Sequence, residues 1–162
     1  MSIKEFEYYH GAVLAKILRK DIPTSLKLVE TNKDSWCVYI INDDVALYIR
    51  YRSPRKANNH LSWNFSFDKK QLTEIREYLD KSLDLKITLI CINGEYKEYK
   101  SEICLLNKEQ FLSIIDIHSI TNQRINVYLE NRKSFRVCGT KSKNSEKIIV
   151  NRCEIDKIKI HG

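Results

Sequence analysis

The stretch ALYIRYRSPRKANNHLSWNFSF, residues 46–67, contains two runs of alternating side chains separated by a polar segment. In the first run, Leu47 and Ile49 alternate with Arg50 and Arg52, which places the two arginines on one face of a strand. The second run places three aromatic rings on a single face: Trp63, Phe65 and Phe67. Because burial of each large ring contributes about 2 kcal/mol or more, we expect this trio to pack in a core rather than to stack on bases. The stretch therefore predicts two strands joined by a polar loop over 53–62.

Helical and extended patterns surround this stretch. Ser2 and Glu5 have the spacing of a capping box and predict a helix over 2–20, and Asn42-Asp43-Asp44 predicts a hairpin turn. Further helices are expected over 68–81 and after Asn107. Other strands are expected at 26–31, 35–41, 86–92, 101–106, 124–129, 134–138 and 148–150. The 162 residues are therefore predicted to form one α+β domain, 1–162, with a mixed sheet, β-hairpins and about three helices.

Residues 1–92 have the expected order αβββαβ, which resembles the core of the restriction-endonuclease-like (PD-(D/E)xK) nucleases. In that family an acid from the first helix, an Asp at a strand start and an acidic-x-Lys triplet hold Mg²⁺ and orient water. The resemblance implies Glu5 or Glu7 as the helix acid and Asp43 or Asp44 at the strand start, although both Asp residues also suit a turn.

The triplet position reads Tyr48-Ile49-Arg50, so the acid and the lysine are both replaced. This departure implies a degenerate active site, in a relative that grips nucleic acid without cleaving it. The chain also resembles a set of uncharacterised bacterial proteins, through YHGAVL (9–14), LYIRYRS (47–53), the Trp-x-Phe-x-Phe strand and the LICxxGEY…ICLL pattern within 89–106. That second resemblance implies no activity.

Charge favours a negatively charged partner. The chain has 28 Lys and Arg against 21 Asp and Glu, a formal charge of +7, and a positive balance raises the local concentration of polyanions. Four cations lie close together: Arg50, Arg52, Arg55 and Lys56. Such charges repel one another unless an anion or carboxylates lie nearby, and the sequence leaves phosphate and neighbouring acids as alternatives. We take these four as the candidate nucleic-acid-binding residues.

A second basic region follows the predicted hairpin at 124–138. It is interrupted only by Glu146 and contains Arg132, Lys133, Arg136, Lys141, Lys143 and Lys147. A solvated loop explains these charges as well as a binding surface does. Whether the two basic regions meet in space is not evident from the sequence.

Cysteine and histidine patterns predict no metal and no cofactor. The five cysteines include no CxxC pair, and an odd number favours buried free thiols in a reducing compartment. The four glycines form no phosphate-binding loop. His10, close to Glu7, could transfer protons, but a structural histidine is the preferred interpretation.

Location and source are predicted from composition. The N-terminus MSIKEFEYY has charges where a signal peptide needs an apolar run, and no segment reaches the ~20 apolar residues of a membrane span. We therefore expect a cytoplasmic protein without membrane contact. The richness in Ile, Lys and Asn favours a bacterial or phage source.

The function predicted from the sequence is binding without catalysis, most simply of DNA or RNA through the basic strand and loop. One alternative is a protein–protein interaction module or homodimer whose hairpins and nine tyrosines form the interface. A second alternative is a metal-dependent nuclease. Substrate, oligomeric state and the choice between DNA and RNA are not predicted.

Overall fold

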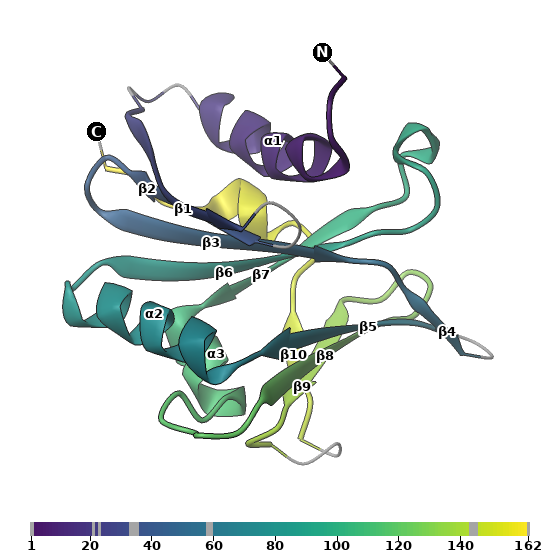
Figure 1. The fold of residues 1–162 in the computed structure, drawn as a ribbon. Coiled ribbons are helices and arrows are strands. Elements are labelled where there is room, and N and C mark those ends of the chain that lie inside the picture. Colours follow the sequence, from purple (N-terminus) through teal and green to yellow (C-terminus); the bar gives the residue numbers. More distant parts are fainter. Residues whose placement is uncertain are drawn as a thin grey trace.

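The stretch 46–67 crosses from one β-sheet to another. It forms strands β3 (Val45–Arg52) and β5 (His60–Phe67), with a short β4 (Arg55–Ala57) between them. β3 belongs to one five-stranded sheet, called sheet A, and β5 to a second, called sheet B, and Figure 1 shows sheet A above sheet B. The structure is a computed structural model that describes residues 2–20, 22, 24–32, 36–57, 60–142 and 146–161, without the side chains at 30–32, 56–57 and 96.

Sheet A is mixed and has the strand order β1-β2-β3-β6-β7. β3 and β6 run parallel, whereas the other neighbours are antiparallel. Its remaining strands are β1 (Leu26–Asn32), β2 (Trp36–Ile41), β6 (Asp84–Cys91) and β7 (Glu102–Asn107). Parallel neighbours need a long crossover, and here the crossover from β3 to β6 contains β4, β5 and a helix.

Sheet B is antiparallel throughout, with the order β10-β9-β8-β5-β4. Its remaining strands are β8 (Gln123–Leu129), β9 (Phe135–Gly139) and β10 (Ile148–Val150). The α+β class is confirmed, but the strands form two sheets, of which one is mixed. The predicted loop over 53–62 is wrong, because β4 pairs with the start of β5. Polar side chains suit such a short edge strand, since they discourage pairing with other chains.

Two groups of helices cover the sheets. Helix α1 (Glu5–Leu18) and the 3₁₀ turn η2 (Glu154–Lys157) pack on the face of sheet A that is turned away from sheet B. Helices α2 (Lys69–Asp80) and α3 (Lys108–Ile114) pack with the inner faces of both sheets, as Figure 1 shows. A further 3₁₀ turn, η1 (Tyr96–Glu98), lies between β6 and β7. None of the described helices is long and apolar enough to cross a membrane.

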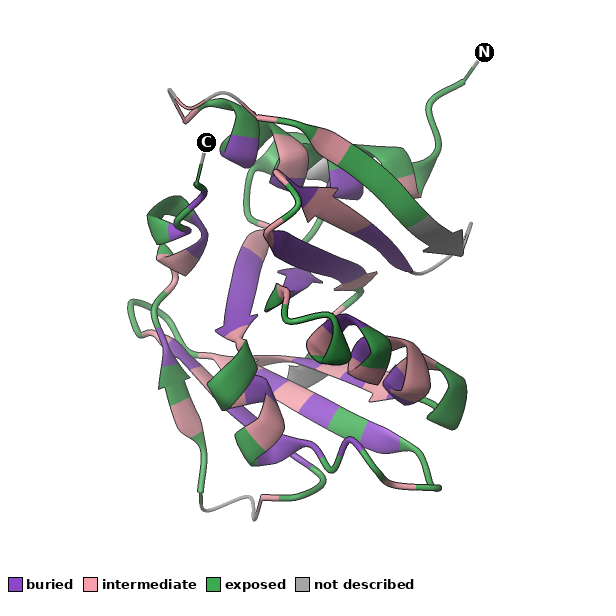
Figure 2. Ribbon diagram, turned by 90° about the vertical axis from the view of Figure 1, so that its left-hand side faces the viewer, coloured by how far each residue is buried: buried purple, intermediate pink, exposed green. Residues whose placement is uncertain are grey.

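Two apolar cores lie on either side of sheet A. The larger one fills the space between the sheets and contains the aromatic trio Trp63, Phe65 and Phe67, so the prediction of a buried trio is confirmed. The smaller core joins α1 to the outer face of sheet A. β6 contributes Leu89 to the first core and Ile90 to the second, which explains its unbroken apolar run. Figure 2 shows the buried residues concentrated on the strands and on the inward sides of the helices.

Helix starts follow the capping logic in two of three cases. α2 begins after Asp68 and α3 after Asn107, as predicted, and each of these side chains accepts a hydrogen bond from the backbone N–H three residues on, that of Gln71 and that of Gln110. The predicted cap of α1 at Ser2 and Glu5 is wrong. α1 instead begins after Lys4, whose backbone N–H donates to the Glu7 carboxylate at 2.7 Å, because a glutamate three residues into a helix reaches back to the free amide.

Candidate functional site

Arg50 is buried, although the alternation of β3 predicts an outward arginine. Its side chain is 6% exposed, its Nη1 donates a hydrogen bond to the Ser66 carbonyl, and the guanidinium lies 5.0 Å from the centroid of the Phe67 ring. Burial lowers the pKa of Arg50 below its usual value. Arg50 and Tyr48 do share a face of β3, but that face is turned toward sheet B. The prediction of an exposed Arg50 is therefore wrong.

Arg50 and Arg52 connect β3 to the edge of β5. β4 pairs with β5 only as far as Ser62. Beyond that point Arg52 Nε donates to the Asn64 carbonyl at 3.2 Å, and Arg50 donates to the carbonyl of Ser66, two residues further along β5. Backbone carbonyls need hydrogen-bond donors when they leave water, so the arginines supply what a longer β4 would otherwise supply.

A polar pocket of about 380 Å³ lies where these arginines meet. Its lining residues are Glu5, Arg50, Tyr51, Arg52, Ser53, Arg55 and Asn64. Of these, only Glu5 is acidic, and no ion pair between described residues includes any of the three arginines. The pocket is therefore positively charged. The side chain of Lys56, the fourth candidate, lies outside the described residues.

Strand register brings the two basic regions onto the outer face of sheet B. Arg55 is paired with Ser62, Ser62 with Tyr128, and Tyr128 with Arg136. Directly opposed residues of antiparallel strands project to the same side, so these four side chains form one row, called the Arg55–Arg136 row. Ser62 alternates with the buried Trp63, which turns the row away from the core. With about 4.8 Å between strands, the ends of the row are about 14 Å apart.

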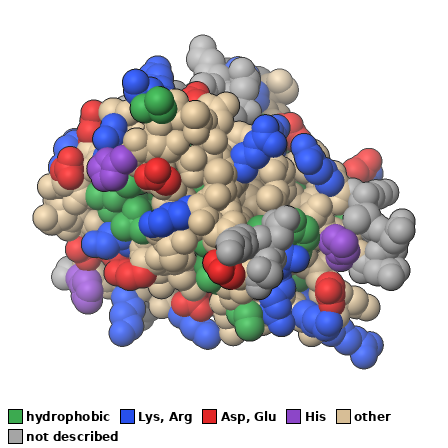
Figure 3. Space-filling model, turned by 90° about the horizontal axis from the view of Figure 1, so that it is seen from below, with side chains coloured by type: hydrophobic (Ala, Val, Ile, Leu, Met, Phe, Trp, Pro, Cys, Tyr) green, Lys and Arg blue, Asp and Glu red, His purple; other side chains and the backbone are tan. Residues whose placement is uncertain are grey.

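On one side of this row the paired residues are an uncharged pair and then a pair with one arginine. Asn64 is paired with Asn126, and its Nδ2 donates to Asn126 Oδ1 at 2.6 Å. The next outward pair is Ser66 and the exposed Arg124. Figure 3 shows this side of the molecule, where Lys and Arg side chains stand around uncharged surface with some acidic side chains between them.

Some cations of the second basic region are already engaged. Lys133 forms an ion pair with Glu130, and its hydrogen bond lowers the pKa of the Glu130 carboxyl. Lys141 Nζ donates to the Leu112 carbonyl at 3.1 Å. Lys143 lies outside the described residues.

Other cations of this face form no ion pair with an acid that the structure describes, although Glu130 interacts electrostatically with Arg136. No ion pair within the described part of the chain includes them; they are Arg55, Arg124, Arg136 and Lys147. They come from both basic regions and from β8. The outer face of sheet B therefore carries more positive than negative charge.

The acids implied by the nuclease resemblance lie at opposite ends of β3. Asp43 and Asp44 form the turn before β3, where Asn42 and Asp43 have φ of 50° and 55°, as expected of turn residues. Glu5 instead lines the pocket beside Arg52, at the other end of the strand. The eight residues of β3 span about 25 Å. Among the described residues, no group of three or more His, Cys, Asp and Glu side chains could hold a metal ion.

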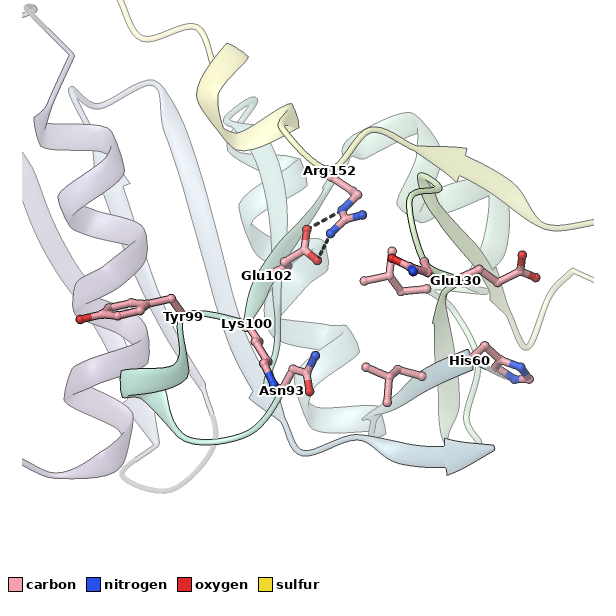
Figure 4. Close-up of a pocket in the computed structure, with 10 residues that line it drawn as sticks. His60, Asn93, Tyr99, Lys100, Glu102, Glu130 and Arg152 are labelled. Carbon is pink, nitrogen blue, oxygen red and sulfur yellow. Dashed lines mark hydrogen bonds and ion pairs between the residues drawn. The ribbon is translucent and has the colours of Figure 1, made fainter. Parts of the chain in front are cut away.

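A larger pocket of about 710 Å³ has balanced charges. Arg152 forms an ion pair with Glu102, in which Nε donates to Oε1 at 2.6 Å and Nη2 donates to the other oxygen. This hydrogen bond raises the pKa of Arg152. Figure 4 shows the pair on one side of the pocket, with His60 and Glu130 across from it. Because Arg152 is already paired with Glu102, we expect this pocket to attract anions less strongly than the outer face of sheet B does.

An apolar pocket of about 630 Å³ lies between α1 and η2. Tyr8 and Tyr99 contribute to its lining, and Tyr99 is 92% exposed. Exposed aromatic rings are enriched at protein interfaces. If the protein is an interaction module, this is the surface that would bind the partner protein.

His10 is a buried histidine that packs between aromatic rings. It is 4% exposed and lies 5.7 Å from the Phe6 ring and 5.9 Å from the Tyr51 ring, measured between centroids. Burial lowers the pKa of His10 to about 4, and its Nε2 has no hydrogen-bond partner among the described residues. These contacts agree with the structural interpretation of His10.

We expect His10 to make the fold acid-sensitive. The folded protein keeps His10 neutral while the unfolded chain takes up a proton below about pH 6.5, so the free energy of unfolding falls as pH drops from about 6.5 toward 4. The loss attributable to His10 is about 2 kcal/mol between pH 7 and pH 5. Urea unfolding of wild type and His10→Gln at both pH values measures it. An equal loss in the variant would assign the acid sensitivity to other groups.

The sequence reasoning missed Arg124, Asn126 and Tyr128 as members of the basic face. The signal was present, because these polar residues alternate with Ile125 and Val127 along β8. The alternation does not reveal which strand pairs with β8, so it does not show that Tyr128 lies in the same row as Arg55.

No protein-family model, no curated protein sequence and no solved structure matches the chain.

Proposed function

We propose that the chain binds nucleic acid on the outer face of sheet B. The observation that carries this proposal is the Arg55–Arg136 row, which joins cations from two sequence regions about 80 residues apart on one face. Lys and Arg neutralise phosphates and release condensed counterions, which is the main source of affinity for nucleic acid. Two cations about 14 Å apart on one face, neither of them in an ion pair with a described acid, fit an extended polyanion better than an isolated small anion.

The surface between the cations also suits this ligand. Asn64, Asn126 and Ser66 place amide and hydroxyl groups beside the row, and such groups donate to and accept from sugars and base edges. Arg52 and Arg55 extend the positive charge into the neighbouring pocket. Arg50 acts as a positioning residue here, because its hydrogen bond to Ser66 attaches β5 to β3.

The double variant Arg55→Gln with Arg124→Gln should weaken binding of a single-stranded oligonucleotide by about tenfold or more at 0.1 M salt. Each lost phosphate contact should also reduce the slope of log K against log salt by about 0.7. Both arginines are exposed and take part in no ion pair with a described acid, so their replacement leaves the fold intact. Fluorescence anisotropy over a salt series measures both quantities.

A matched control is Arg19→Gln with Lys159→Gln. It removes the same charge from two exposed residues that follow α1 and η2 and form no ion pair with a described acid, on the side of sheet A that is turned away from sheet B. Equal weakening by the two double variants would contradict a localised site and indicate diffuse attraction. A wild-type protein that binds no oligonucleotide at low salt but self-associates would favour the interaction module instead.

A further inference from the structure

A small pocket opens beside the Arg55–Arg136 row. It has a volume of about 110 Å³ and is lined by His60, Tyr128, Glu130, Lys133, Ser134, Arg136 and Lys147. Two of these residues are rings and three are cations, while the carboxylate of Glu130 is held by Lys133. The pocket therefore combines aromatic surface with three cations and one acid, Glu130, which pairs with Lys133 and also interacts electrostatically with Arg136. Because the cations outnumber the acid, a positive charge remains.

The rings and cations are close enough to act on one ligand. The centroids of the His60 and Tyr128 rings are 5.8 Å apart with their planes inclined by 55°. Lys147 Nζ lies 4.1 Å from the centroid of the Tyr128 ring. Arg136 is paired with Tyr128 on the neighbouring strand and projects to the same face. The Nη1 atom of Arg136 is buried and has no hydrogen-bond partner among the described residues.

An ammonium group over a tyrosine ring is held only weakly, by about 0.5–1 kcal/mol at an exposed site. A nucleobase that stacks on the same ring gains about 1–3 kcal/mol. The base can therefore take the place of Lys147 over Tyr128. The displaced ammonium then remains within reach of the phosphate that adjoins the base, beside Arg136.

We propose that this pocket receives an unstacked base of a single-stranded nucleic acid, with Tyr128 as the stacking surface and with Lys147 and Arg136 on the adjoining phosphate. The inference rests on the proposed function and adds a preference for single strands over duplex. In a duplex each base is already stacked on its neighbours, and only the backbone can reach a pocket of this size. A single strand presents free base faces.

The test compares Tyr128→Leu with Tyr128→Phe on a single strand of about 12 nucleotides, a length within the range that such surfaces cover, and on a duplex of the same length. Tyr128→Leu should weaken single-strand binding about tenfold and leave duplex binding unchanged, while Tyr128→Phe should bind as wild type does. Stacking needs the ring and not the hydroxyl. Tyr8→Leu serves as the control, because it removes a partly exposed tyrosine from α1.

The outcomes separate the two proposals. If wild type binds neither probe, both the proposed function and this inference are wrong. If wild type binds both probes and the two Tyr128 variants weaken them equally or not at all, nucleic-acid binding stands and the stacking pocket is wrong. The pocket is supported if Tyr128→Leu weakens single-strand binding tenfold and leaves duplex binding unchanged, while Tyr128→Phe binds the single strand as wild type does.

Discussion

Gly139→Ala should lower the free energy of unfolding by about 3 kcal/mol, at the upper end of the cost of overpacking. A Cβ at this position in β9 would lie 2.2 Å from the carbonyl oxygen of Ile114 and 2.9 Å from its carbonyl carbon. That carbonyl also accepts a hydrogen bond from the Lys141 amide at 3.0 Å, so the end of α3 cannot simply move away. Thermal unfolding should show a midpoint lowered by roughly 6–12 °C.

Gly11→Ala is the matched control. A Cβ at Gly11, in the middle of α1, would meet no atom within 4 Å, and alanine forms helix more readily than glycine by about 0.5–1 kcal/mol. The same substitution should therefore stabilise the fold at one glycine and destabilise it at the other. A Gly139→Ala protein as stable as wild type would mean that β9 does not approach α3 this closely.

Trp63→Ala should cost about 4 kcal/mol, within the range for removing a large buried ring. The Trp63 side chain is 1% exposed and belongs to the core between the sheets. Its Nε1 also donates to the Ile92 carbonyl at 2.9 Å, so truncation leaves both a cavity and a buried acceptor without its donor. Urea unfolding followed by circular dichroism measures the loss.

Trp63→Phe removes the hydrogen bond and the smaller ring of the indole but keeps a six-membered ring in the core. The expected cost therefore lies between about 1 kcal/mol, the low end for an unsatisfied buried acceptor, and the about 4 kcal/mol expected of Trp63→Ala. The same variant should bind oligonucleotides as wild type does, because the ring faces the core and not the outer face of sheet B. Weakened binding by a stably folded Trp63→Phe protein would argue that the aromatic trio touches the ligand.

Much of the fold follows from local pattern. The alternation over 46–67 predicts both β3 and β5, with the correct inward residues for β5, and Asp68 and Asn107 predict the starts of α2 and α3. Sheet membership does not follow, because it depends on pairing partners distant in sequence. β5 pairs with β8, and the local alternation of Trp63 and Phe65 is the same whether the partner is β3 or β8.

The candidate site was predictable in kind but not in composition. Charge clustering placed Arg55 among the candidate residues and left open whether a phosphate or an acid lies beside it; no ion pair between described residues includes Arg55. Alternation placed Arg50 on the same face as Arg52, but it does not reveal that β5 crosses over that face and covers Arg50. Only the strand register shows that Tyr128 and Arg124 share the outer face of sheet B with Arg55.

The order of strands in sheet B has a consequence for synthesis on the ribosome. Phe67 at the end of β5 is paired with Gln123, so β5 emerges more than fifty residues before the strand that will hold it. At 5–20 residues per second, its aromatic side chains wait roughly 3–10 s for their partner. During that interval the nascent chain exposes an aggregation-prone aromatic strand. The yield of folded protein in cells should therefore depend on chaperones that shield this strand until β8 has left the exit tunnel.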